Sequence, residues 1–298
     1  MYYRRKILLA LLGVFDGQLT AKQFQKYLFL FTHKQETKSF DFVPYRYGCF
    51  SFQANQDMVI LTKYGFCKIV QTENGRFYKL TNEEEFISTL KPEDKKSLFD
   101  VKAQFGNLTQ TDLIRYTYRQ YPYYATKSTI AKDLLNSEEL SAIEQQKRHY
   151  LEKKLFTIGY EGISLETYIN KLIINDVHVL CDVRKNAYSQ KYGFSKKTLE
   201  QACKGADIEY IHIPDLGIVS DKRKELHTQA DYDSLFQEYK ETTLAENKES
   251  LLNIRTLLNN GKRVALTCFE KDPKQCHRTC VANALMQLPE TDYKLEQL

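Results

Sequence analysis

The chain has 298 residues, of which 42% are hydrophobic and 27% charged, with a formal net charge of +5. This composition is that of a globular protein of about two domains, and it excludes collagen-like, coiled-coil and wholly disordered chains. The longest apolar run, residues 7–15, is much shorter than the ~20 residues of a transmembrane helix, and no signal-peptide cleavage site follows it. We therefore expect a cytoplasmic protein without a membrane anchor.

Charge and aromatic residues are unevenly used. Residues 1–150 contain 22 lysines and arginines against 16 aspartates and glutamates, a net charge of +6, whereas the remainder has 21 against 22, a net charge of −1. The chain also has 21 tyrosines, 17 phenylalanines and no tryptophan. A basic, tyrosine-rich half is typical of a module that binds a polyanion such as nucleic acid, although solvated surface lysines explain the charge equally well.

The first half is predicted to be mainly helical. Helices are expected over residues 5–15, 50–64, 93–105 and 109–121, and a capping box at Thr20 and Gln23 begins another that contains residues 24–31. Two strands, residues 66–71 and 76–80, flank Asn74-Gly75, the dipeptide most typical of a tight hairpin. Three helices followed by a hairpin are the order of a winged helix, so we predict a winged-helix-like binding domain over residues 1–131.

The second domain is predicted over residues 155–298, after a polar helical linker at residues 132–154. Apolar strands are expected over residues 156–160, 177–183, 208–213 and 263–269. Helices are expected over residues 164–174, 195–204, 232–258 and 276–288. Strands that alternate with helices build a parallel sheet with helices on both faces, so the predicted fold class of this domain is α/β.

Candidate site residues follow the predicted strands, at the edge where open parallel sheets bind ligands. They are Tyr160, Asp182, Arg184, Asp215, Gly217, Glu270, Cys276, His277 and Arg278. Glu270 is the expected general acid or base, and Asp182 is a second catalytic carboxylate. Arg184 and Arg278 are expected to bind phosphate or another anion, in a pocket completed by Tyr160, Asp215 and Gly217. The alternative to these catalytic and anion-binding roles is structural: Asp182 forms an ion pair with Arg184 or Arg278, and the pair only fixes the loops.

Thiols gather near the last predicted strand, at Cys268, Cys276 and Cys280, beside His277. Their spacing lacks the paired Cys-x2-Cys of zinc sites, and neighbours such as Cys276 and His277 rarely both reach one metal. We therefore predict no metal site, and the sequence identifies no cofactor. Cys276 and His277 remain candidate catalytic residues, because a thiol at a strand end or helix start can be a nucleophile of lowered pKa. The odd cysteine count of seven fits reduced thiols rather than disulfides.

Residues 156–288 resemble the domain-of-unknown-function 488 family. The motifs that carry the resemblance are Thr-Ile-Gly-Tyr at residues 157–160, Cys-Asp-Val-Arg at 181–184, Ile-His-Ile-Pro-Asp-Leu-Gly at 211–217 and Cys-Phe-Glu-Lys-Asp-Pro-Lys-Gln-Cys-His-Arg at 268–278. The resemblance implies the same α/β fold and highlights Asp182, Arg184, Glu270, Cys276, His277 and Arg278. In the first half, residues 42–51 and 113–123 are similar to segments of the Panacea domain found in antitoxins, which implies a helical domain.

Three functions are compatible with these residues. The first is a nucleic-acid-linked enzyme for DNA modification, repair or defence, in which residues 1–131 bind nucleic acid and the α/β domain processes a nucleotide, nucleobase or phosphodiester. The second is a non-catalytic regulator that senses a small anion and binds DNA or a protein partner. The third is a cysteine-dependent sulfurtransferase or redox protein. Asp182-Val-Arg184 is also similar to a strand end of rhodaneses, but the acidic Glu270 and Asp272 are expected to raise the pKa of Cys268, which argues against that chemistry.

Overall fold

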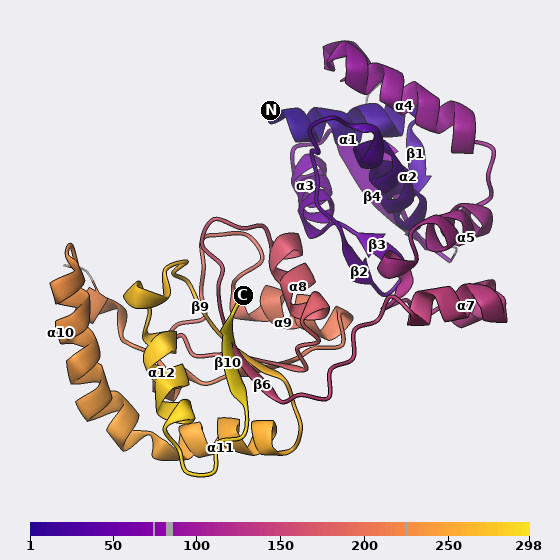
Figure 1. Ribbon diagram of the computed structural model, residues 1–298. Coiled ribbons are helices and arrows are strands. Elements are labelled where there is room, and N and C mark those ends of the chain that lie inside the picture. The colour runs from indigo at the N-terminus through magenta and orange to yellow at the C-terminus, as the bar shows by residue number, and fades with distance from the viewer. Residues whose placement is uncertain (74, 82–85, 224–225) are drawn as a thin grey trace. The chain divides into compact units, whose positions relative to one another are not determined.

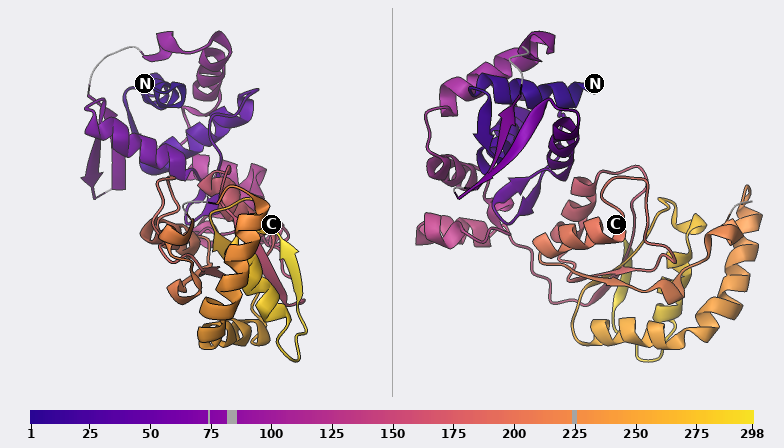
Figure 2. Two further views of the ribbon diagram at one scale, coloured as in Figure 1. Left: turned by 90° about the vertical axis from the view of Figure 1, so that its left-hand side faces the viewer. Right: turned by 180° about the vertical axis from the view of Figure 1, so that it is seen from behind.

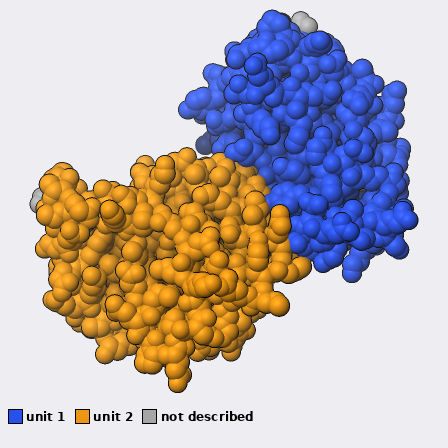
Figure 3. Space-filling view, viewed as in Figure 1, with its two compact units in different colours: residues 1–147 blue, residues 148–298 orange. Residues whose placement is uncertain are grey.

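The structure is a computed structural model that describes residues 1–73, 75–81, 86–223 and 226–298 (Figure 1). The chain forms two compact units, Met1–Lys147 and Arg148–Leu298, which Figure 3 colours separately. In place of the single polar helix expected at residues 132–154 there are two short helices, α6 (Ala131–Leu134) and α7 (Ser137–Glu144). The helix is interrupted because Asn136 is extended and caps α7 in a capping box with Glu139.

Unit 1 is mainly helical and holds two small antiparallel sheets. Its further helices are α1 (Tyr3–Val14), α2 (Ala21–Lys34), α3 (Phe52–Lys63), η1 (Phe86–Thr89), α4 (Pro92–Phe105), α5 (Gln110–Gln120) and η2 (Pro122–Ala125). Its strands are β1 (Gln18–Thr20), β2 (Val43–Tyr45), β3 (Gly48–Phe50), β4 (Cys67–Thr72) and β5 (Gly75–Leu80). The expected helices are confirmed, including the capping box of Thr20 and Gln23 that begins α2. Strands β1, β2 and β3 have three residues each, too few for an alternating pattern to reveal them.

The predicted hairpin of unit 1 is present as β4 and β5, which pair antiparallel along their whole length. Asn74, the first residue of its expected turn dipeptide, lies outside the described residues. Strand β1 pairs with the other side of β5, so the sheet order is β1-β5-β4. Helices α1, α2 and α3 precede this hairpin, with β1 between α1 and α2 and the β2–β3 pair between α2 and α3, and the winged-helix interpretation stays a prediction.

Unit 2 is an α/β domain with a parallel sheet, as the sequence predicts, and the sheet has a fifth strand in addition to the four located in the sequence. Its strands are β6 (Lys154–Gly159), β7 (Val179–Asp182), β8 (Glu209–His212), β9 (Val264–Cys268) and β10 (Lys294–Gln297), in the order β10-β6-β9-β7-β8. All four pairings are parallel. Strand β10 was not expected, because all four of its residues are exposed and show no apolar alternation. It is held at the edge by its pairing with β6 and by an ion pair of 2.7 Å between Lys154 and Glu296.

Helices cover both faces of the unit 2 sheet (Figure 2). They are α8 (Leu165–Ile174), α9 (Lys196–Gly205), η3 (Pro214–Leu216), η4 (Ser220–Arg223), α10 (Gln229–Tyr239), the π-helix η5 (Lys240–Leu244), α11 (Lys248–Asn259), η6 (Pro273–Gln275) and α12 (His277–Met286). One core joins inward residues of the sheet to α10, α11 and α12, among them Val179, Leu266, Leu235, Ile254 and Val281. In the described part of the chain, no helix combines the length and apolarity needed to cross a membrane.

Candidate functional site at the carboxyl edge of the sheet

The loop after β9 is tied to the end of β6 by backbone contacts. The amides of Tyr160 and Glu161 both donate to the carbonyl oxygen of Phe269, at 3.1 and 2.9 Å. A Cβ on Gly159 would collide with the carbonyl oxygen of Glu270, so only glycine permits this approach. The end of β6 therefore fixes the backbone that carries Glu270.

Asp182 and Arg184 form a buried, fully used ion pair at the end of β7. The Arg184 guanidinium donates from Nε to Asp182 Oδ1 at 2.8 Å and from Nη2 to Oδ2 at 2.5 Å, and Tyr210 donates to the same Oδ2 at 2.6 Å. Arg184 Nη1 donates to the Tyr160 hydroxyl at 2.7 Å. Burial lowers the pKa of Arg184, but the hydrogen bond and charge of Asp182 outweigh burial and raise it overall. These contacts support the alternative of the sequence analysis, in which the pair fixes the loops.

Both terminal nitrogens of Arg278 are occupied by the protein itself, whereas its buried Nε has no hydrogen-bond partner among the described residues. Its side chain has 0% exposure, and it donates from Nη1 to the carbonyl oxygen of Glu270 at 2.6 Å and from Nη2 to that of Lys271 at 3.2 Å. The guanidinium thus holds the same loop after β9 that approaches Gly159 of β6. This geometry supports a positioning role for Arg278 instead of the anion-binding role expected from the sequence.

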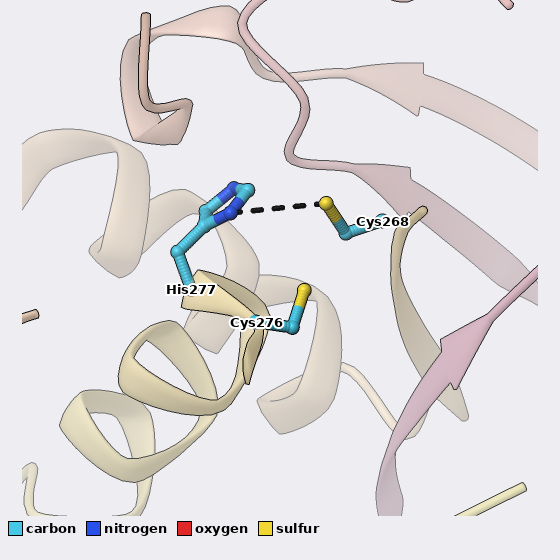
Figure 4. A group of neighbouring side chains, drawn as sticks. All are labelled: Cys268, Cys276 and His277. Carbon is cyan, nitrogen blue, oxygen red and sulfur yellow. Dashed lines mark hydrogen bonds between the residues drawn. The ribbon is translucent and has the colours of Figure 1, made fainter. Parts of the chain in front are cut away.

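Cys268, Cys276 and His277 come together in what we call the thiol–imidazole cluster (Figure 4). Cys268 ends β9, whereas Cys276 and His277 begin α12. The Cys268 sulfur lies 3.7 Å from Nδ1 of His277, and Nε2 of the same ring lies 2.9 Å from the carbonyl oxygen of Val183. The donor atoms of all three residues lie within 4.8 Å of one another, so the cluster could hold a metal ion.

Glu270 lies beside this cluster. Its Oε2 is 3.3 Å from the Cys268 sulfur, and its Oε1 pairs with the guanidinium of Arg223. The Glu270 side chain is 12% exposed and that of Arg223 26%, whereas the three residues of the cluster are almost completely buried. Glu270 and Arg223 therefore form the more accessible side of the site.

The ionisable groups of this site shift one another's pKa. A hydrogen bond from Cys276, and after it the positive charge of His277, lower the pKa of Cys268 well below its usual range, although burial opposes them. Burial lowers the pKa of His277, but the Cys268 charge raises it overall. Burial, with the Cys268 charge second, raises the pKa of Glu270. The expectation that acidic neighbours would raise the pKa of Cys268 is therefore wrong, because Cys276, His277 and Arg223 outweigh them.

Asp215 and Gly217 lie elsewhere on the same edge. They line a cavity of about 300 Å³ together with Lys185, Lys222 and Tyr239. Among the described residues, the lining of this cavity includes neither Glu270 nor the thiol–imidazole cluster. Gly217 is required for packing, because a Cβ there would collide with the backbone of Lys185. The nine predicted site residues therefore do not form one pocket. Asp182, Arg184 and Tyr160 belong to the buried ion pair and its contacts, and Arg278 holds the loop after β9. Asp215 and Gly217 line the cavity, whereas Cys276 and His277 belong to the thiol–imidazole cluster, with Glu270 beside it.

Two residues that contact these groups were not expected from the sequence. Arg223 pairs with Glu270 from η4, which lies 47 positions before Glu270 in the chain. No apolar pattern in the sequence predicts this short helix. Tyr210 sits within β8, where an aromatic residue is expected for packing, yet its hydroxyl donates to Asp182. Only the role of Tyr210 could have been predicted from the sequence. Asp182 ends the neighbouring strand, and a buried carboxylate there needs additional hydrogen-bond donors.

Unit 2 is therefore a parallel α/β domain whose sheet edge carries a buried thiol–imidazole cluster next to a glutamate. Residues 164–285 match a family model described as "Domain of unknown function DUF488", so this part of the chain is a DUF488 domain, as its motifs predicted. The match contains every predicted site residue except Tyr160. No curated protein and no solved structure matches the chain. The resemblance of unit 1 to the Panacea domain stays a prediction.

Proposed function

We propose that the chain is a nucleic-acid-linked enzyme, in which unit 1 binds DNA or RNA and unit 2 processes a nucleotide, nucleobase or phosphodiester. The observation that carries the proposal is the position of Glu270, a carboxylate held by Gly159 and Arg278 at the sheet edge where ligands of such folds bind. Its neighbours Cys268 and Arg223 supply a sulfur and a cation within contact distance. Glu270 serves as the general acid or base.

The nucleic-acid half of the proposal rests on a basic hollow in unit 1. A cavity of about 460 Å³ is lined by Lys22, Lys26, Arg46 and Arg76 together with aromatic residues such as Tyr47. Lys22 Nζ lies 4.3 Å from the centre of the Tyr47 ring, and that residue is 45% exposed. Cations next to an exposed aromatic ring suit phosphates and a stacked base.

Not every basic residue of unit 1 is available for a ligand. Arg4 and Arg5 donate to the carboxylate of Asp57, which is completely buried, at 2.6 and 2.7 Å. Lys26 donates to the carbonyl oxygens of Tyr47 and Cys49, at 2.6 and 3.2 Å, and so holds the turn between β2 and β3. Lys22, Arg46 and Arg76 are therefore the residues that we expect to contact phosphate.

Binding of the full chain to labelled single- and double-stranded DNA and RNA tests this half of the proposal. Fluorescence anisotropy across a salt series is expected to show log-affinity falling linearly with log-salt. Changing Lys22, Arg46 and Arg76 together to alanine should weaken binding and reduce the salt slope by about 1 for each phosphate that these side chains neutralise. Changing Lys204 and Lys262, exposed lysines of unit 2, is the matched control and should leave the slope unchanged. Absence of binding at low salt would overturn the assignment.

Turnover assays of the full chain test the second half. Nucleotides, nucleobase-containing oligonucleotides and strands with cleavable phosphodiesters are the substrates, and Glu270→Gln is expected to reduce turnover by at least about 100-fold. Asp272→Asn changes an exposed carboxylate of the same loop and should retain turnover. Equal turnover by Glu270→Gln and the unchanged chain contradicts the acid–base role. A small anion that raises the melting temperature without any turnover would favour the regulator instead.

A further inference from the structure

The thiol–imidazole cluster combines three soft donors in one buried place. Cys268, Cys276 and His277 have exposures of 1%, 0% and 2%, and their donor atoms lie within 4.8 Å of one another. Figure 4 shows the Cys268 sulfur and the imidazole facing each other across a gap, with the Cys276 sulfur on the same side. Two thiolates and an imidazole are the donor set of Cys2His zinc sites.

The spacing argument against a metal fails because of the backbone at the start of α12. Cys276 precedes the helix with extended dihedral angles, φ −133° and ψ 129°, whereas His277 is the first helical residue. The chain changes direction between the two residues, so neighbouring side chains that would diverge in a strand both reach Cys268. Adjacent positions in the sequence therefore do not prevent joint binding here.

The distance between the donors fits a tetrahedral zinc ion. Zinc–sulfur and zinc–nitrogen bonds of ~2.3 and ~2.0 Å place such donors roughly 3.5 Å apart at a tetrahedral angle. The Cys268 sulfur and His277 Nδ1 are separated by 3.7 Å. An ion could enter between these two atoms with little movement of the backbone.

The far side of the imidazole is prepared for metal binding as well. Nε2 of His277 lies 2.9 Å from the carbonyl oxygen of Val183, which can only accept a hydrogen bond. One ring proton is therefore held at Nε2, and Nδ1, which lies nearest the Cys268 sulfur, offers its lone pair to a metal ion once its own proton is released. Metal-ligating histidines almost always make such an outer hydrogen bond, which fixes the tautomer and orientation of the ring.

Charge balance also favours a divalent cation. Glu270 and Arg223 pair with each other, so their charges offset one another next to the cluster. Zinc binding would displace the remaining thiol proton, and the ion would neutralise the two thiolates, which would be costly to bury without a cation. Three protein donors leave a fourth position, as in catalytic zinc sites, and Glu270 Oε2 lies close to the cluster, 3.3 Å from the Cys268 sulfur.

We propose that Cys268, Cys276 and His277 bind one zinc ion at the carboxyl edge of the unit 2 sheet. The donor set selects zinc because thiolate and imidazole ligands in tetrahedral geometry suit it better than the hard cations magnesium or calcium. The inference does not depend on the proposed function, since it concerns the metal and not the substrate.

The test is metal analysis of the full chain, purified with a reductant and without chelators. About one zinc ion per chain is expected by mass spectrometry of the metal content. After the metal is removed, titration with Co²⁺ should produce the thiolate charge-transfer absorption and intense visible bands of a tetrahedral cobalt–sulfur site. Less than a tenth of an equivalent of zinc, together with no cobalt spectrum in the reduced chain, overturns the proposal.

Variants separate a metal site from a merely buried cysteine cluster. Loss of an outer hydrogen bond alone weakens metal binding 10–100-fold, so Cys276→Ser and His277→Ala are each expected to weaken zinc binding by more than about 100-fold. Cys203→Ser changes another buried cysteine of unit 2 and should keep the zinc, with circular dichroism confirming that every variant is folded. Equal affinity in Cys276→Ser and the unchanged chain contradicts the assignment. Glu270→Gln should keep the metal, so metal content and turnover report separately on the two proposals.

Discussion

Replacing Asp182 by alanine is expected to lower the free energy of unfolding of unit 2 by about 3–5 kcal/mol. The carboxylate has 0% exposure and the Arg184 residue 5%, so the substitution leaves a buried guanidinium without its counter-charge. It also removes the acceptor of the Tyr210 hydroxyl. Urea unfolding of the full chain by circular dichroism measures the loss, and hydrogen exchange of the β7 amides assigns it to unit 2.

A double variant distinguishes the uncompensated charge from other effects of the Asp182 substitution. Combining Asp182→Ala with Arg184→Met removes both charges, and it should recover part of the lost stability because no buried ion is left unpaired. Glu238→Ala breaks an exposed ion pair with Lys222 in the same unit and should change stability by less than about 0.5 kcal/mol. A loss of under 1 kcal/mol for Asp182→Ala would contradict the description of a buried, fully used pair.

Gly159→Ala is expected to displace the loop after β9 and to abolish the activity assigned to Glu270. The new Cβ would collide with the Glu270 carbonyl oxygen and approach Nη1 of Arg278 to 3.3 Å. Overpacking of this kind costs about 1–3 kcal/mol, and here the clash is with backbone that cannot rotate away. Unfolding and turnover of the same variant measure the two consequences.

The control for this substitution is Gly162→Ala, three residues further along the chain. Gly162 has a φ of +79° but nothing within 4 Å of an added Cβ, so alanine adds backbone strain without a collision. We expect a cost of about 1 kcal/mol and unchanged turnover. If Gly159→Ala behaves like Gly162→Ala, the close approach between β6 and the loop is not required for the site.

The fold was largely predictable from the sequence because its signals are local. The strand at residues 264–268 is apolar throughout apart from one threonine, and the capping box at Thr20 needs only residues three positions apart. The short β1 and the exposed β10 escaped prediction, because tertiary pairing and not an apolar pattern holds them in their sheets.

The candidate site was predictable in its place but not in its roles. Glu270, Cys276 and His277 follow a strand, so the topology brings them to the carboxyl edge. The pairing of Asp182 with Arg184 was one of the alternatives that the sequence offered. The other partners could not be predicted, because a sequence does not reveal that Tyr210 donates to Asp182 or that two carbonyl oxygens accept from Arg278. Arg223 reaches Glu270 across 47 positions of the chain, and no local pattern encodes that contact.

The donors of the thiol–imidazole cluster are unusually close in the chain, with Cys268 and His277 only nine positions apart. Closing so short a loop carries a small entropy cost, which grows only with the logarithm of loop length. The Asp182–Arg184 pair spans two positions and is closer still. The Asp182–Arg184 pair and the thiol–imidazole cluster therefore need only the end of β7, the end of β9 and the start of α12, and neither uses a residue of the edge strand β10. The central groups of the edge thus come from two short segments, residues 182–184 and 268–277, while Tyr160, Tyr210 and Arg223 contact them from other elements.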